Sequence, residues 1–269
     1  MTVDKGLGRG VLRSPYRAVG VVVWPASISG WVLLGLAGAG LTDVPSFCAD
    51  SRIWQSPGPE ALAFARVWID PVRMAQAWAL MLVAMMLPLL MVPLVHVRSR
   101  VLPRCRVPAQ SACVAGYGLV WMTAGGGLIA AMVWIRLGLT DGWQAHAAVA
   151  LAVLALFWQV TPWKQRALNR CHARPELRGA TRAALWDAWV FGLGQGVWCV
   201  LSCWALMALA LAVPKWHLAA MAVVSLWIWA ERLDPPARPS WRLSRPIAGA
   251  RLLRRVLHAG FAQRKGIRT

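Results

Sequence analysis

Long apolar runs separated by short basic segments constrain the fold of this chain more than any other feature. Of its 269 residues, 58% are hydrophobic and only 14% are charged, whereas about a quarter of the residues of a soluble domain are charged. A run of about 20 apolar residues crosses the hydrocarbon layer of a bilayer as a helix, which satisfies its own backbone hydrogen bonds. We therefore predict an all-α protein, a polytopic bundle of transmembrane helices.

The apolar runs predict six spans, over residues 18–41, 74–97, 112–137 and 143–162, a fifth that crosses to 213, and 216–230. The first run is longer than the apolar stretch of a signal peptide, so we predict that it stays in the protein as a span. A basic N-terminal segment, 1–17, precedes the transmembrane domain of residues 18–233. A basic tail, 234–269, follows it and contains an amphipathic stretch, Ile247–Phe261, that is expected to lie on the membrane.

Basic residues outnumber acidic ones, with 29 Lys and Arg against 10 Asp and Glu. Most of them fall in the N-terminus, in the loops after the second and fourth predicted spans, and in the tail. Cytoplasmic segments carry such an excess, so we predict a multi-pass protein of a bacterial inner membrane with both ends in the cytoplasm. Basic segments placed between spans face anionic lipid headgroups, which makes membrane lipids the expected partner and excludes a nucleic acid.

Four residues of the fifth predicted span are spaced four apart: Gln195, Cys199, Cys203 and Met207. At 3.6 residues per turn this spacing drifts by only about 40° per step, so the four side chains form one stripe. Two cysteines one turn apart can hold an ion between them, and thiolate and thioether sulfur favour Cu(I). The alternative interpretation is ordinary packing, because cysteine and methionine are common buried residues.

The second predicted span carries a methionine pair at the same spacing, Met81 and Met85. Their thioethers are soft, weak ligands that could pass a copper ion along, although a methionine stripe also serves plain helix packing. Pro88 and Pro93 interrupt the helical hydrogen bonds of this span. Broken helices at membrane depth often line a cavity, so this segment is a candidate neighbour of a polar site.

Polar residues gather where the fourth span ends. Cys171 and His172 could collect a metal at the cytoplasmic mouth, or could be plain loop residues. Glu231 closes the sixth span, and we expect it to pair with Lys164, Arg232 or Arg98 on the same side of the membrane. Asp187 is expected to pair with Arg182 in the same way.

These segments occur in an order that resembles the DUF2182 family, bacterial integral membrane proteins usually described as predicted metal-binding. The resemblance rests on AMMLP in the second span, QxTPxK followed by a cysteine, CxxxCWxLM in the fifth span, and the closing Glu231, and it runs from Met74 to Glu231. The family commonly has CxGCCW in the fifth span, and this chain has Ser202 in place of one of those cysteines. Family members also often have a histidine at the position of Gln195 and a further cysteine at the position of Ala167. The resemblance thus implies a metal site with a reduced ligand set.

Two hypotheses of function follow. In the first, the protein handles copper or another soft metal. The ion is bound by Cys199, Cys203 and Met207, which face Met81 and Met85 across a helix interface. Cys171 and His172 collect the ion from the cytoplasm. In the second, the chain is a non-catalytic accessory or assembly subunit of a larger membrane complex, whose partner helix approaches at Gly192, Gly194 and Gly196. The chain has no zinc-protease motif, nucleophile elbow or phosphate-binding loop, so we predict that it is not an enzyme.

Overall fold

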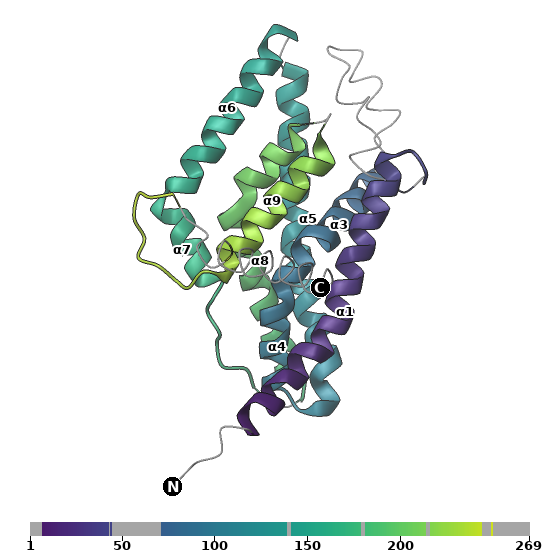
Figure 1. Ribbon diagram of the computed structural model, residues 1–269, viewed down its shortest axis with the longest axis vertical. Helices are drawn as coiled ribbons and strands as arrows, with labels where there is room; N and C mark the ends of the chain where they lie inside the picture. The colour runs from purple at the N-terminus through teal and green to yellow at the C-terminus, as the bar shows by residue number, and fades with distance from the viewer. Residues whose placement is uncertain are drawn as a thin grey trace, which may run out of the picture.

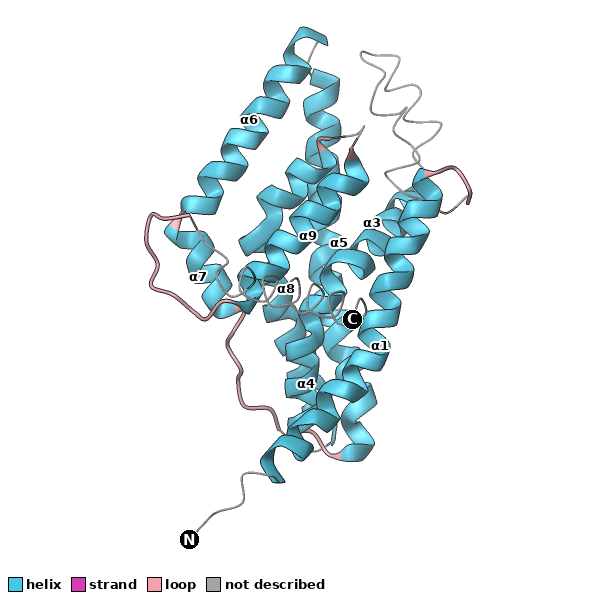
Figure 2. Cartoon of the chain, viewed as in Figure 1, coloured by secondary structure: helices cyan, strands magenta, loops and turns pink. Residues whose placement is uncertain are grey.

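The computed structural model describes residues 7–42, 44, 71–138, 141–178, 181–213, 216–243 and 249. Regular structure within these ranges is helical, which confirms the all-α prediction (Figure 2). The α-helices are α1 (Leu7–Gly38), α3 (Pro71–Met86), α4 (Met91–Arg100), α5 (Arg106–Gly138), α6 (Asp141–Val160), α7 (Pro162–Arg170), α8 (Thr181–Leu211) and α9 (His217–Leu233). Two short 3-10 helices, η1 (Leu87–Leu90) and η2 (Pro103–Cys105), connect them. Apart from Gly249, the predicted amphipathic stretch 247–261 lies outside the described residues.

Four helical stretches are long and apolar enough to cross a membrane: Pro15–Gly38, Pro71–Arg100, Pro103–Met132 and Arg182–Leu211. They coincide with the first, second, third and fifth predicted spans and indicate a multi-pass membrane protein. The fourth and sixth predicted spans form α6 and α9, which are not among these four stretches. The described apolar part of α6 is Val149–Val160, and α9 has 17 residues. Six spans and a cytoplasmic location of both ends remain predictions.

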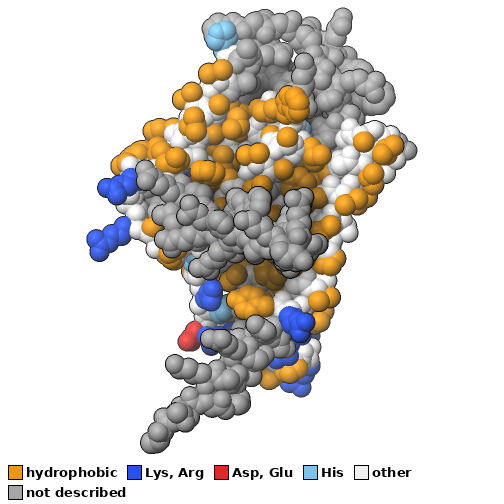
Figure 3. Space-filling model, viewed as in Figure 1, with side chains coloured by type: hydrophobic (Ala, Val, Ile, Leu, Met, Phe, Trp, Pro, Cys, Tyr) orange, Lys and Arg blue, Asp and Glu red, His pale blue; other side chains and the backbone are white. Residues whose placement is uncertain are grey.

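In the bundle, α1 and α6 lie on opposite sides, with α3, α5, α8 and α9 between them (Figure 1). Hydrophobic side chains cover the visible faces of α6, α9 and α1, whereas lysine and arginine lie at one side and toward one end (Figure 3). Large apolar side chains such as Val21, Val153 and Leu226 are exposed on these helices. An apolar exterior around a packed core is what a lipid-facing bundle requires.

A helix break divides the second span at Pro88, as its sequence predicts. Pro88 has no N–H to donate to the carbonyl one turn before it, that of Ala84. The hydroxyl of Ser27 in α1 donates to the Ala84 carbonyl instead, at 2.7 Å. The indole N–H of Trp229 in α9 donates to the next carbonyl, that of Met85, also at 2.7 Å. Neighbouring helices therefore take up these two carbonyls and fix α1 and α9 against the break.

The tightest packing in the bundle joins α5 and α8. A Cβ atom on Gly192 would lie 2.2 Å from the carbonyl oxygen of Cys113, and one on Gly196 would lie 2.8 Å from Cβ of Val120. Gly194 has nothing within 4 Å of such an atom. The expectation that all three glycines serve an external partner is thus corrected, because Gly192 and Gly196 bring α8 against α5 within the chain.

The sequence Thr161-Pro162 separates α6 from α7 and turns a lysine inward. Proline disfavours helical backbone in the residue before it, and Thr161 is extended, with ψ of 144°. The Thr161 hydroxyl accepts the backbone N–H of Lys164 at 3.3 Å and so caps α7, which begins with Pro162. This local geometry buries the Lys164 side chain in the bundle instead of leaving it at the surface.

Candidate metal site

The predicted sulfur stripe of α8 faces the core. Gln195, Cys199, Cys203 and Met207 are all buried. The Cys203 thiol donates to the carbonyl of Cys199 at 3.0 Å, so the two cysteine side chains lie one above the other along α8. The stripe is therefore a continuous buried line with two adjacent thiols at its middle.

Two aromatic residues of α5 direct hydrogen-bond donors at this line. The Tyr117 hydroxyl donates to the sulfur of Cys199 at 3.2 Å. The buried indole N–H of Trp121 is an electrostatic neighbour of the same sulfur and makes no hydrogen bond within the described residues. Both donors could hydrogen-bond a thiolate equally well, so the arrangement suits a sulfur that has lost its proton to a metal.

A third thiol and a guanidinium complete the cluster. Cys171 follows α7 directly, and its thiol is buried. Arg232, at the end of α9, is an electrostatic neighbour of Cys171, Cys199 and Cys203. Its backbone carbonyl lies 3.3 Å from Nε2 of His172, which places the end of α9 beside the end of α7.

Burial raises the pKa of the Cys171 thiol to about 12, although the charge of Arg232 acts in the opposite direction. The thiol therefore stays protonated at neutral pH, and only thiolate reacts rapidly with electrophiles. The test uses two variants, one that keeps Cys171 as its single cysteine and one that keeps the half-buried Cys105. We expect a maleimide at pH 7.5 to label Cys171 far more slowly than Cys105. Mass spectrometry over time measures both rates, and equal rates before and after unfolding would contradict the burial of Cys171.

The ring of His172 is engaged by backbone carbonyls. Its Nδ1 lies 3.0 Å from the carbonyl oxygen of Leu168, and its Nε2 lies 3.3 Å from that of Arg232. In this position neither nitrogen is free to bind a metal, and the ring instead ties the end of α7 to the end of α9. A ligand role for His172 requires the ring to turn, and it stays a prediction.

Met81 and Met85 are buried in the same core as the cysteines. However, α3 packs chiefly against α1 and α5, whereas α8 packs chiefly against α5, so the two sulfur-bearing helices share no extensive interface. Among the described residues, no three His, Cys, Asp or Glu side chains lie close enough to hold one metal ion together. The direct facing of the methionines and cysteines therefore also stays a prediction.

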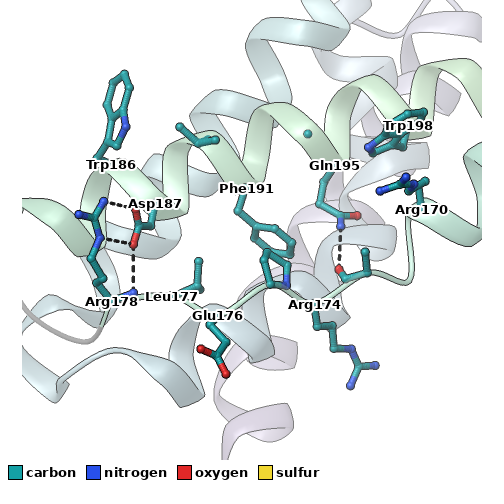
Figure 4. Close-up of a pocket in the computed structure, with 14 residues that line it drawn as sticks. Arg170, Arg174, Glu176, Leu177, Arg178, Trp186, Asp187, Phe191, Gln195 and Trp198 are labelled. Atoms are coloured by element: carbon teal, nitrogen blue, oxygen red, sulfur yellow. Dashed lines mark hydrogen bonds and ion pairs between the residues drawn. The ribbon is translucent and has the colours of Figure 1, made fainter.

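The described residues form two ion pairs. Of the three partners expected for Glu231, the structure selects Lys164, which also donates to Gln159. The expected pairing of Asp187 with Arg182 is wrong, because the Asp187 carboxylate pairs with Arg178 at 2.6 Å. Arg178 reaches Asp187 because the loop before α8 runs back along that helix (Figure 4).

That loop, residues 173–178, is held against α8 and α4 by one buried polar side chain from each helix. Gln195 donates to the carbonyl of Ala173 at 3.4 Å, and a ring nitrogen of His96 lies 2.9 Å from the carbonyl of Pro175. Between the loop and α8 lies a pocket of about 590 Å³, whose wall includes Gln195 and Trp198 (Figure 4). The pocket therefore ends at the residues next to Cys199.

Sequence reasoning missed Tyr117, Trp121, Arg232 and His96 as parts of this region. Tyr117 carried a signal, since it is one of only two tyrosines and stands in an apolar run. Arg232 was considered only as a partner of Glu231, because a cation at the end of a span is also the ordinary mark of a cytoplasmic boundary.

Comparison with known families identifies the chain. Residues 75–254 match the family model of PpoB2, described as a copper chaperone. Neither the curated proteins nor the solved structures contain a match to this chain. The matched range covers more than half of the chain and includes the α8 stripe, Cys171 and Arg232. The match to this family model supports the expected resemblance to a metal-handling membrane family. The family model does not carry the name DUF2182. The chain therefore belongs to the PpoB2 copper chaperone family.

Proposed function

We propose that this protein is a membrane copper chaperone that carries Cu(I) as cargo between Cys199 and Cys203. The observation that carries the proposal is the pair of buried thiols one turn apart on α8, with the Tyr117 hydroxyl directed at one of them. Thiolates are the soft ligands that select Cu(I) over harder cations. Two of them suffice, because Cu(I) accepts two-coordinate sulfur geometry.

The thioethers supply weaker positions beyond this pair. Met207 lies one turn further along α8, and Met81 and Met85 lie in the same core. We assign them the role of soft ligands to which the ion passes from the cysteines, because a chaperone must release its cargo as well as bind it. This role predicts that their loss slows transfer without removing the bound ion.

We assign the pocket beside α8 the role of an entrance for the ion from the loop side of the bundle. Its wall reaches Gln195 and Trp198, and Cys199 follows in the next position of α8. Cys171 and His172 stand where the loop leaves α7, and we assign them the first capture of the ion, for which the His172 ring turns away from the carbonyls of Leu168 and Arg232. The accessory-subunit alternative loses part of its support, since Gly192 and Gly196 are used inside the chain.

The test is the copper content of the double variant Cys199→Ser/Cys203→Ser. We expect purified wild-type protein, loaded with Cu(I) under reducing conditions, to bind about one ion per chain, and the double variant to lose nearly all of it. Elemental mass spectrometry gives the ratio of metal to protein. The double variant Cys48→Ser/Cys105→Ser removes as many thiols elsewhere and is expected to bind like the wild type. Equal copper in the wild type and the Cys199/Cys203 variant would refute the proposal.

A further inference from the structure

A second pocket, of about 640 Å³, opens where α6 meets α7 and α8. The helix α7 continues from the end of α6 in a different direction, and α8 packs against both of them (Figure 1). All three helices contribute to the wall, α6 with Trp158, α7 with Arg166 and Arg170, and α8 with Trp198 and Leu201. Among the described residues that line this pocket none is acidic, whereas the pocket under the loop contains two carboxylates.

The charged groups of this second pocket are both cations. Arg166 and Arg170 lie four positions apart, about one helical turn, and both are exposed. Neither belongs to the two ion pairs of the described residues, and the Arg170 guanidinium lies over the ring of Trp198, 5.7 Å from its centroid. The Asn169 side chain, also in the wall, is held by the backbone of Ala237 at 2.7 and 3.1 Å. The pocket therefore offers two positive charges to an anion.

Aromatic and aliphatic side chains form the rest of the wall. The indole N–H of Trp158 donates to the carbonyl of Leu201 at 3.0 Å, which fixes α6 to α8. The Trp158 ring also packs edge-on against Trp204, with 5.4 Å between the ring centroids. Residues next to the wall in α6 and α8 are exposed and apolar, Phe157 and Val197. A ligand of this pocket thus meets cations on α7 and apolar surface on α6 and α8.

Two tryptophans mark the end of the apolar stretch of α6. That stretch ends at Val160, and Trp158 and Trp163 stand on either side of its end. Trp163 is 56% exposed. Indole rings favour the boundary between acyl chains and headgroups, and basic pockets between membrane helices on the cytoplasmic side bind anionic headgroups. The pocket therefore has the composition of a lipid site at the membrane interface.

We propose that this pocket binds one anionic phospholipid. Its phosphate contacts Arg166 and Arg170, and its acyl chains lie along the apolar surface of α6 and α8. A soluble phosphate would meet the two arginines but leave the apolar wall uncovered, which favours a lipid as the ligand. The site uses none of the sulfur residues, so the inference is independent of the proposed copper function.

The test is the lipid preference of the delipidated, full-length protein in a neutral detergent. Phosphatidylglycerol and phosphatidylcholine are offered in equal amounts, and native mass spectrometry identifies and counts the lipids retained by each chain. We expect the wild type to retain one phosphatidylglycerol in preference to phosphatidylcholine. Arg166→Gln/Arg170→Gln is expected to lower this preference by about tenfold or more, because two charge interactions with the phosphate are lost.

Two further variants separate the charge of this pocket from the charge of the whole protein. Arg166→Lys/Arg170→Lys keeps both charges and is expected to retain most of the preference. Arg100→Gln/Arg104→Gln removes two exposed arginines from another basic segment and is the matched control, expected to behave like the wild type. All four arginines are exposed, so each variant should fold, which thermal melting without lipid checks.

Glycerol phosphate, a soluble phosphate without acyl chains, distinguishes the two sources of the anion. We expect phosphatidylglycerol to raise the melting temperature of the wild type but not that of Arg166→Gln/Arg170→Gln, because a ligand stabilises the state that binds it. Equal stabilisation by glycerol phosphate would overturn the lipid assignment and leave a site for soluble phosphates. The same lipid preference in Arg166→Gln/Arg170→Gln and Arg100→Gln/Arg104→Gln, high or low, would overturn the proposal altogether.

Discussion

Replacing Gly192 with alanine is expected to unfold most of the protein or lower its stability by about 3 kcal/mol, the upper end for an overpacked core. The added Cβ would lie 2.2 Å from the carbonyl oxygen of Cys113 and 2.9 Å from its carbonyl carbon and Cα. These are backbone atoms of α5, so no side-chain rotation relieves the clash and the two helices must separate. Separation also withdraws Tyr117 from Cys199, so copper binding should fall together with the melting temperature.

The same helix contains the control. Gly194→Ala adds a methyl group where nothing lies within 4 Å, and replacing a helical glycine with alanine favours the helix by up to about 1 kcal/mol. Thermal melting in detergent should therefore show a large fall for Gly192→Ala and no fall for Gly194→Ala. Similar melting temperatures for the two variants would mean that α5 and α8 are not packed as described.

Breaking the buried pair of Lys164 and Glu231 on one side is expected to destabilise the bundle by about 3–5 kcal/mol. Both side chains are nearly inaccessible, at 2% and 3% exposure. Lys164→Met leaves a buried carboxylate with only the indole N–H of Trp227, and Glu231→Gln leaves a buried ammonium with neutral amide oxygens as its only partners. Each single variant therefore keeps a charge in the core without its counter-charge.

The double variant Lys164→Met/Glu231→Gln removes both charges and should recover much of the loss, so the single effects are not additive. A double-mutant cycle on melting temperature or denaturant midpoint measures this coupling. The pair of Arg178 and Asp187 is the control, because Arg178 is 66% exposed and solvent screens the interaction. Additive effects at Lys164 and Glu231 would show that their pairing contributes nothing to stability.

Local geometry made part of this structure predictable. The spacing of four between Cys199, Cys203 and Met207 fixes one face on any helix, and that face is buried. Likewise, Pro88 lacks the N–H that a continuous helix needs, and the break lies there. The helix start at Thr161-Pro162 is equally local, yet we predict a basic loop after the fourth span, whereas the structure forms α7 there and buries Lys164. Each of these features depends on a few neighbouring residues, which a sequence shows directly.

Contacts between distant helices were not predictable in the same way. Tyr117 meets Cys199 only because Gly192 lets α8 approach α5 so closely, and a helical glycine could equally have served another protein. Asp187 pairs with Arg178 because of the path that the preceding loop takes, which spacing along a helix does not encode. Likewise, α7 and α9 end side by side because His172 lies against the carbonyl of Arg232, a contact between residues 60 positions apart.

X-ray absorption at the copper edge of the Cu(I)-loaded, full-length protein tests the central claim most directly. If Cys199 and Cys203 hold the ion, the spectrum will show monovalent copper with sulfur neighbours and no nitrogen, and Cys199→Ser/Cys203→Ser will lose that signature. Copper bound through imidazole nitrogen, or an unchanged sulfur signature in the double variant, would contradict the account and place the cargo elsewhere in the protein.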